Sequence, residues 1–144
     1  MGLFDRMFGK KPSGDLPAID RRDPETKASP PGSEADWEDQ GTPQEMQPAE
    51  VREALAGSEP PQLLDVREPH ELKASGWIPG AIHIPMAQVQ TRLGELDKTR
   101  PVVVYCARGM RSFDVGFLLI ENGFKNVSNL NGGMHAWDGD VAWE

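Results

Sequence analysis

Continuous apolar runs alternate with amphipathic segments from residue 46 to the end of the chain. The runs 62–66 and 101–105 are rich in Leu and Val, as is typical of strands buried on both faces of a parallel sheet. The segments 47–57 and 112–121 place their apolar residues on one helical face, and a glycine marks each helix end. The alternation predicts an α/β domain built on a parallel sheet.

Shorter patterns extend this prediction. Residues 67–73 begin a further helical turn, and 76–85 form a turn with a very short strand between prolines. Apolar residues spaced by three and four predict a helix over 86–96. Residues 125–130 form the last strand, and a glycine-rich turn leads into a short helix within 131–137.

The first part of the chain does not follow the alternation. Residues 12–45 hold six prolines and carry nine acidic but only three basic side chains. A segment with so few large apolar residues cannot bury enough surface to offset the entropy cost of ordering it. We therefore expect residues 1–45 to be a disordered, acidic and proline-rich segment, followed by one domain over 46–144.

Residues 1–11 form a pattern of their own. If they are helical, four apolar side chains share one side: Leu3, Phe4, Met7 and Phe8. Such a helix predicts weak contact with a membrane surface or a partner, and a frayed terminus is the alternative. The stretch is too short, and too interrupted by charge, to span a bilayer. We therefore expect no transmembrane segment here.

Charge and cysteine content exclude some classes of function. The net charge is −8, and no basic patch or stripe is present of the kind that binds nucleic acid. The single cysteine excludes an internal disulfide and fits a reducing compartment, so we expect a cytoplasmic protein.

The candidate chemistry is centred on Cys106, which directly follows the strand 101–105. In open α/β sheets, ligands bind between the carboxyl end of a strand and the start of the next helix. Helix N–H groups, together with Arg108 and Arg111, favour the thiolate, and Gly109 lets the loop turn its N–H groups inward. A small buried cysteine beside surface arginines is the alternative, but the agreement of these features favours an active site.

The loop Cys-Ala-Arg-Gly-Met-Arg-Ser, residues 106–112, resembles the active-site loop of the rhodanese (sulfurtransferase) family. Four residues separate Cys106 from Arg111, whereas protein tyrosine phosphatases and the related dual-specificity phosphatases have five, in a cradle sized for phosphate. The resemblance implies a central parallel sheet flanked by helices on both faces. It also implies that Cys106 carries a persulfide, held by a shorter ring of N–H groups.

Three more stretches extend the resemblance over 46–144: Leu-Leu-Asp-Val-Arg-Glu, Gly-Trp-Ile-Pro-Gly-Ala, and Leu-x-Gly-Gly-x-x-Ala-Trp. In the second stretch, Trp77 replaces a histidine that is usual in the family. Position at the sheet edge and resemblance together give three candidate rim residues: Asp65, Arg67 and Trp77. For Asp65 and Arg67, an ion pair that fixes the neighbouring loops is the favoured interpretation.

The predicted site has Cys106 as nucleophile and six loop residues that bind substrate: Ala107, Arg108, Gly109, Met110, Arg111 and Ser112. Arg108 steers an anionic sulfur donor such as thiosulfate, Arg111 bonds within the loop, and Ser112 caps the following helix. The acceptor, cyanide or a thiol, comes from outside because the chain has no second cysteine. This chemistry needs no metal and no organic cofactor.

Two other functions stay open at this stage. One is a persulfide carrier or docking module that delivers sulfur to a protein, which the long acidic segment supports by raising effective concentration. The other is a cysteine-based phosphatase or arsenate reductase, which the loop length disfavours.

Overall fold

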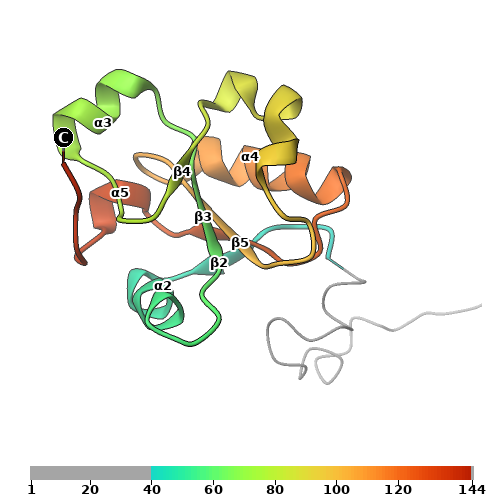
Figure 1. Cartoon of the computed structure of the whole chain (residues 1–144), viewed down its shortest axis with the longest axis horizontal. Coiled ribbons are helices and arrows are strands. Elements are labelled where there is room, and N and C mark those ends of the chain that lie inside the picture. Colours follow the sequence, from blue (N-terminus) through green and yellow to red (C-terminus); the bar gives the residue numbers. More distant parts are fainter. Residues whose placement is uncertain (1–39, 144) are drawn as a thin grey trace, which may run out of the picture. The chain divides into compact units, whose positions relative to one another are not determined.

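A computed structural model describes residues 40–143 (Figure 1), so the predictions for residues 1–39, including the helix over 1–11, lie outside the described residues. Five parallel strands form one sheet in the order β2-β6-β5-β3-β4. The strands are β2 (Gln44–Met46), β3 (Gln62–Asp65), β4 (Ile82–His83), β5 (Val102–Tyr105) and β6 (Val127–Leu130). The predicted parallel α/β sheet is confirmed.

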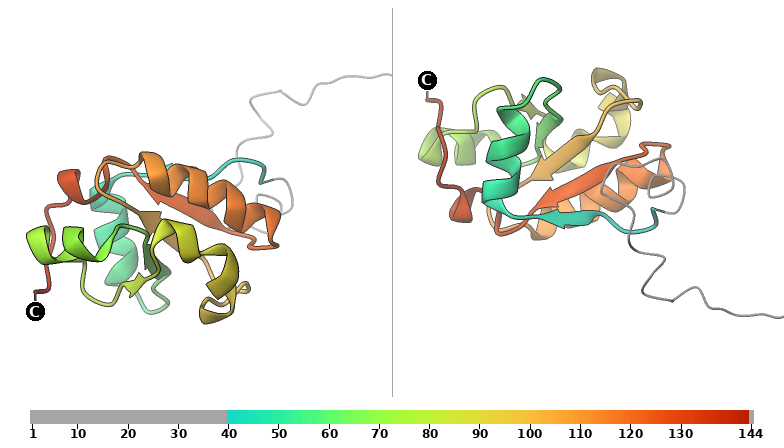
Figure 2. Two further views of the ribbon diagram at one scale, coloured as in Figure 1. Left: turned by 90° about the horizontal axis from the view of Figure 1, so that it is seen from above. Right: turned by 90° about the horizontal axis from the view of Figure 1, so that it is seen from below.

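Helices cover both faces of the sheet (Figure 2). They are α2 (Pro48–Leu55), α3 (Pro69–Ser75), α4 (Met110–Glu121) and α5 (Gly133–Ala136). Successive strand residues point to opposite faces, so Leu64 packs in a cluster with Val115 of α4, whereas Leu63 packs in a cluster with Val51 of α2. Within 40–143, no helix is long and apolar enough to cross a membrane.

The domain begins earlier than predicted. Strand β2 lies ahead of the expected start at residue 46 and pairs with β6. The Gln40 side chain exchanges two hydrogen bonds with the Val127 backbone, at 2.7 and 3.0 Å, and Pro43 lies against Gly116 of α4. A three-residue edge strand in a proline-rich context has no detectable hydrophobic period, and for this reason the composition of 12–45 was misleading here.

The helix predicted over 86–96 is present only as 3-10 turns. Two 3-10 helices, η3 (Met86–Gln88) and η4 (Gln90–Glu95), occupy this segment, and Arg92 has a non-helical φ of −121°. Its apolar positions were assigned correctly, since Val89 and Leu96 are buried. The spacing of three from residue 86 to 89 and from 93 to 96 matches the three-residue turn of a 3-10 helix.

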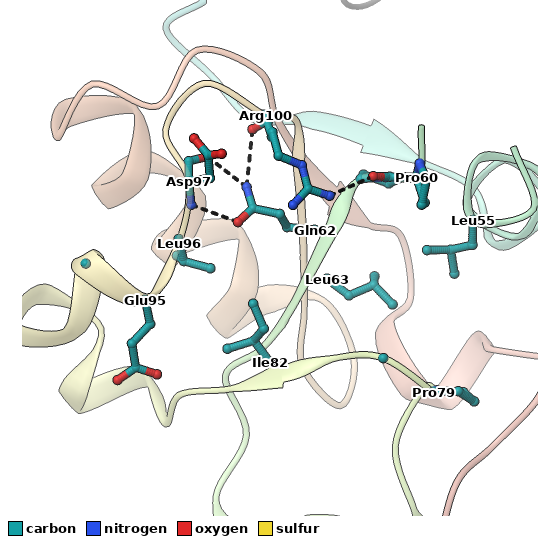
Figure 3. A pocket seen from close by; sticks show the side chains of 13 residues that line it. Leu55, Pro60, Gln62, Leu63, Pro79, Ile82, Glu95, Leu96, Asp97 and Arg100 are labelled. Atoms are coloured by element: carbon teal, nitrogen blue, oxygen red, sulfur yellow. Dashed lines mark hydrogen bonds between the residues drawn. The ribbon is translucent and has the colours of Figure 1, made fainter. Parts of the chain in front are cut away.

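The amino edge of the sheet, opposite the Cys106 loop, holds an open cavity of about 610 Å³ (Figure 3). Polar side chains that line this cavity already form hydrogen bonds within the protein. The Gln62 side chain donates to Asp97 O at 2.8 Å and accepts from Asp97 N–H at 2.8 Å, and Arg100 donates to Pro60 O. Gln62 therefore ties the start of β3 to the connection that leads into β5.

Candidate active site

Cys106 follows the last residue of β5 and is buried, with 1% of its surface exposed. Gly109 ends the loop as the N-cap of α4, with φ of 101°. That backbone conformation favours glycine, and a Cβ there would lie 3.3 Å from the Gly132 backbone nitrogen. The loop therefore requires glycine at this position.

The loop carbonyls are bound from outside the loop. Met134 N–H and His135 N–H of α5 donate to Cys106 O at 2.8 Å and to Ala107 O at 2.9 Å. A Cβ on Gly133 would lie 2.5 Å from Cys106 O, so glycine is needed for this close approach. With the carbonyls directed towards α5, the loop N–H groups are free to face the thiol.

Three hydrogen-bond donors surround the Cys106 Sγ. They are Gly109 N–H at 3.1 Å, the Ser112 hydroxyl at 3.3 Å and Ser112 N–H at 3.4 Å. Burial raises the pKa of the thiol, but hydrogen bonds from Ser112, Gly109 and Arg108 outweigh it and bring the pKa below its ordinary value. The loop thus favours the nucleophilic thiolate.

The structure corrects the predicted role of Ser112. The N-cap of α4 is Gly109, and Ser112 lies within the first turn of the helix. Its buried hydroxyl contacts the Cys106 Sγ and the Asn129 side-chain oxygen of β6. Ser112 is therefore placed to donate to the Cys106 thiolate and is not a helix cap.

The predicted bonding partner of Arg111 is also wrong. Its guanidinium does not bond within the loop but forms a two-pronged pair with Glu71 of α3, at 2.9 and 2.8 Å. This hydrogen-bonded pair lowers the pKa of Glu71 to about 2 and raises that of Arg111. The pair connects α3 to the loop that carries Cys106.

Asp65 and Arg67 form the predicted clamp. Arg67 Nη2 donates to Asp65 Oδ2 at 2.7 Å, and the two side chains are 1% and 0% exposed. The same guanidinium donates to Gly76 O at 2.8 Å and to the Ser75 hydroxyl at 3.0 Å. The clamp therefore fixes the C-terminal end of α3 against the end of β3.

Two cavities lie along different sides of α3. One, of about 310 Å³, adjoins the loop and is lined by Arg67, His70, Glu71, Ala74, Ser75, Ala107, Arg108, Met134 and His135. The other, of about 340 Å³, is lined by Asp65, Pro69, Leu72, Lys73, Trp77, Ala81 and His83. Of the three candidate rim residues, only Arg67 lines the cavity beside the loop.

Several residues that contact the loop or line its cavity come from other elements and were not predicted from the sequence. Glu71 lies in the predicted helical turn 67–73 and Asn129 in the predicted strand 125–130, and neither was a candidate site residue. Asn129 carried a usable signal, because a polar side chain within a buried strand needs hydrogen-bond partners. His70 and His135, from α3 and α5, line the cavity beside the loop and had no such signal. Among residues 40–143, no cluster of three side chains suited to a metal ion is found.

Comparisons with known proteins agree with this geometry. The sequence profile of the Rhodanese-like domain matches residues 47–140. YtwF of Bacillus subtilis is 42% identical over 97 residues, which cover 67% of this chain and 92% of that protein. A sulfurtransferase of Allochromatium vinosum is 39% identical over 93 residues, which cover 65% of this chain and 86% of that protein.

A solved structure has the same fold. The crystal structure of a rhodanese-like domain protein from Staphylococcus aureus superposes with a TM-score of 0.65 at 34% identity, covering 70% of this chain and 98% of that one. The chain belongs to the family of rhodanese-like domains.

Proposed function

We propose that the protein is a sulfurtransferase that moves a sulfane sulfur from an anionic donor such as thiosulfate to cyanide or a thiol, through a persulfide on Cys106. The observation that carries the proposal is the set of three donors around the Cys106 Sγ, which lower the pKa of the thiol. The similarity to a protein named as a sulfurtransferase supports the same reaction class.

In the first half-reaction, the Cys106 thiolate attacks the outer sulfur of thiosulfate. A new S–S bond forms to Cys106 while the old S–S bond breaks, and sulfite leaves with the bonding electron pair. The product is a persulfide whose negative charge lies on the terminal sulfur. The N–H groups of residues 107–111 stabilise that charge, because the loop carbonyls are held by α5.

In the second half-reaction, cyanide attacks the terminal sulfur. The S–S bond to Cys106 breaks, thiocyanate leaves, and the electron pair of that bond restores the thiolate. A thiol acceptor does the same and becomes a persulfide. Because the chain has a single cysteine, the acceptor comes from outside, and the site works best in a reducing compartment such as the cytoplasm.

Arg108 is suited to attract the donor. It is exposed and lines the cavity beside Cys106, together with His70 and His135. In contrast, Arg111 is occupied by Glu71 and acts on the shape of the loop. An anion therefore meets Arg108 first, and no metal or organic cofactor takes part in the proposed steps.

Steady-state formation of thiocyanate from thiosulfate and cyanide tests the proposal. The wild type should turn over, and Cys106→Ser should fall to background, because no other residue provides a thiolate. Stable loading of Cys106 with negligible turnover would favour the persulfide carrier instead. Hydrolysis of an aryl phosphate that depends on Cys106 would overturn both in favour of a phosphatase.

A further inference from the structure

A line of hydrogen bonds connects the exposed side chain of Glu45 to Cys106. The Asn129 amide nitrogen donates to the two Glu45 carboxylate oxygens at 3.2 and 3.1 Å, and to Gly109 O at 3.1 Å. The Asn129 amide oxygen contacts the Ser112 hydroxyl, which lies 3.3 Å from the Cys106 Sγ. Four elements thus meet in one network: β2, β6, α4 and the loop after β5.

The orientation of the Asn129 amide follows from its partners. A carboxylate and a backbone carbonyl accept hydrogen bonds and cannot donate them. The amide nitrogen must therefore face Glu45 and Gly109, and the amide oxygen must face Ser112. Two oxygen atoms in such close contact need a proton between them, and only the Ser112 hydroxyl has one to give.

Ser112 then has one proton and two acceptors that compete for it. When Cys106 is a thiolate, the sulfur is the stronger acceptor because it is charged. When Cys106 is a thiol or a persulfide, Sγ is uncharged, and the proton returns to Asn129. The negative charge of Glu45 polarises the amide and makes its oxygen a better acceptor.

We propose that Glu45 and Asn129 are positioning residues that draw the Ser112 hydroxyl away from Cys106 and so set the basicity of its thiolate. The assignment deepens the proposed function, since a less stabilised thiolate is more readily converted into the persulfide. In the native chain, the Ser112 proton leaves the sulfur as the persulfide forms and returns when the sulfur is handed on.

The test is a pH titration of the Cys106 thiolate, followed by its ultraviolet absorbance in the full chain. Glu45→Gln should lower the pKa of Cys106 by a few tenths of a unit, because the weakened amide competes less for the proton. Glu53→Gln is the matched control, since Glu53 is an exposed acid that has no hydrogen bond from its side chain within residues 40–143, and it should leave the titration unchanged.

Asn129→Leu removes the competing acceptor without changing charge. It should lower the pKa of Cys106 by about half a unit to one unit, the worth of the neutral hydrogen bond from Ser112 to Asn129. Asn129 is buried, so Asn129→Leu can fail to fold. In that case the titration of Glu45→Gln alone tests the proposal.

A double-mutant cycle separates the network from simple charge repulsion. In a Ser112→Ala background, Glu45→Gln should leave the pKa of Cys106 unchanged, because the hydroxyl that transmits the effect is absent. An equal shift with and without the hydroxyl would mean that Glu45 acts through space, and the proposal would be overturned. An unchanged or raised pKa in Glu45→Gln would overturn it as well. The titration does not require sulfur transfer. Its result is therefore independent of the result of the thiocyanate assay.

Discussion

Two arginine–carboxylate pairs flank α3, and they differ mainly in burial. The pair of Arg67 and Asp65 has side chains 1% and 0% exposed, whereas those of Arg111 and Glu71 are 37% and 22% exposed. The buried pair bonds to the backbone around α3, and the half-exposed pair connects α3 to the Cys106 loop. The Arg67–Asp65 pair therefore stabilises the fold, whereas the Arg111–Glu71 pair positions the loop of the candidate active site.

The difference in burial determines how much each pair contributes to the free energy of unfolding. A buried charge that loses its partner cannot recover its hydration, so its removal is costly. A half-exposed pair is screened by water and contributes little to stability. We therefore expect the Arg67 pair to control the free energy of unfolding, and the Arg111 pair to control the geometry of the loop.

The largest expected effect comes from Arg67→Met. This variant leaves the Asp65 carboxylate buried without its cation and should lower the free energy of unfolding by about 3–5 kcal/mol. Denaturant titration measures the change. Arg52→Met, which breaks an exposed pair with Asp138, is the control and should cost about 0–1 kcal/mol. Equal losses in the two variants would remove the distinction between buried and exposed pairs.

Arg111→Met tests the other half of the comparison. Loss of the bond to Glu71 should let the loop shift, and a misplacement of this kind lowers the rate of sulfur transfer by about 100-fold. The free energy of unfolding should fall by less than in Arg67→Met, because water screens the partly exposed pair. Thiocyanate formation and denaturant titration on the same sample give both values. A stability loss as large as that of Arg67→Met, or an unchanged rate, would contradict the assigned role.

Ser112→Ala changes the thiol and leaves both pairs intact. Removing one of the three donors to Sγ should raise the pKa of Cys106 by about one unit, since a hydrogen bond to a charged group is lost. Thiolate absorbance as a function of pH reports the shift. A pKa that stays in place would mean that the backbone N–H groups alone set the acidity of Cys106.

The smallest expected effect concerns acid stability. The pKa of Glu71 is lowered from 4.5 to about 2, mainly by the hydrogen bond from Arg111. Because the pKa is depressed in the folded state, the stabilisation is complete above 4.5 and is lost as the pH falls towards 2. Unfolding of the wild type and Glu71→Gln should therefore differ by a constant amount above pH 4.5 and converge below it. A difference that persists at the lowest pH would show that the pair does not depend on the Glu71 charge.

Local pattern was enough to predict the strands β3, β4, β5 and β6 and the Cys106 loop, but not β2. Buried parallel strands appear as continuous apolar runs, and the cysteine with its glycine and arginines lies within seven consecutive residues. The ion pair of Asp65 and Arg67 was predictable for the same reason, because a single residue separates them in sequence.

Contacts that depend on the folded chain were not predictable. Arg111 finds Glu71 forty positions away, and Glu45 finds Asn129 across the pairing of β2 with β6. Nothing near Arg111 in the sequence indicates which carboxylate it will meet. The two corrected roles, of Arg111 and Ser112, both concern side chains whose partners come from another element.

Intact-protein mass spectrometry after incubation with thiosulfate measures whether Cys106 takes up a sulfane sulfur. The wild type should gain one sulfur atom, roughly 32 Da, cyanide should remove it, and Cys106→Ser should gain nothing. A wild type that gains no sulfur from thiosulfate or another sulfane donor would contradict the claim that this loop makes Cys106 a carrier of sulfane sulfur.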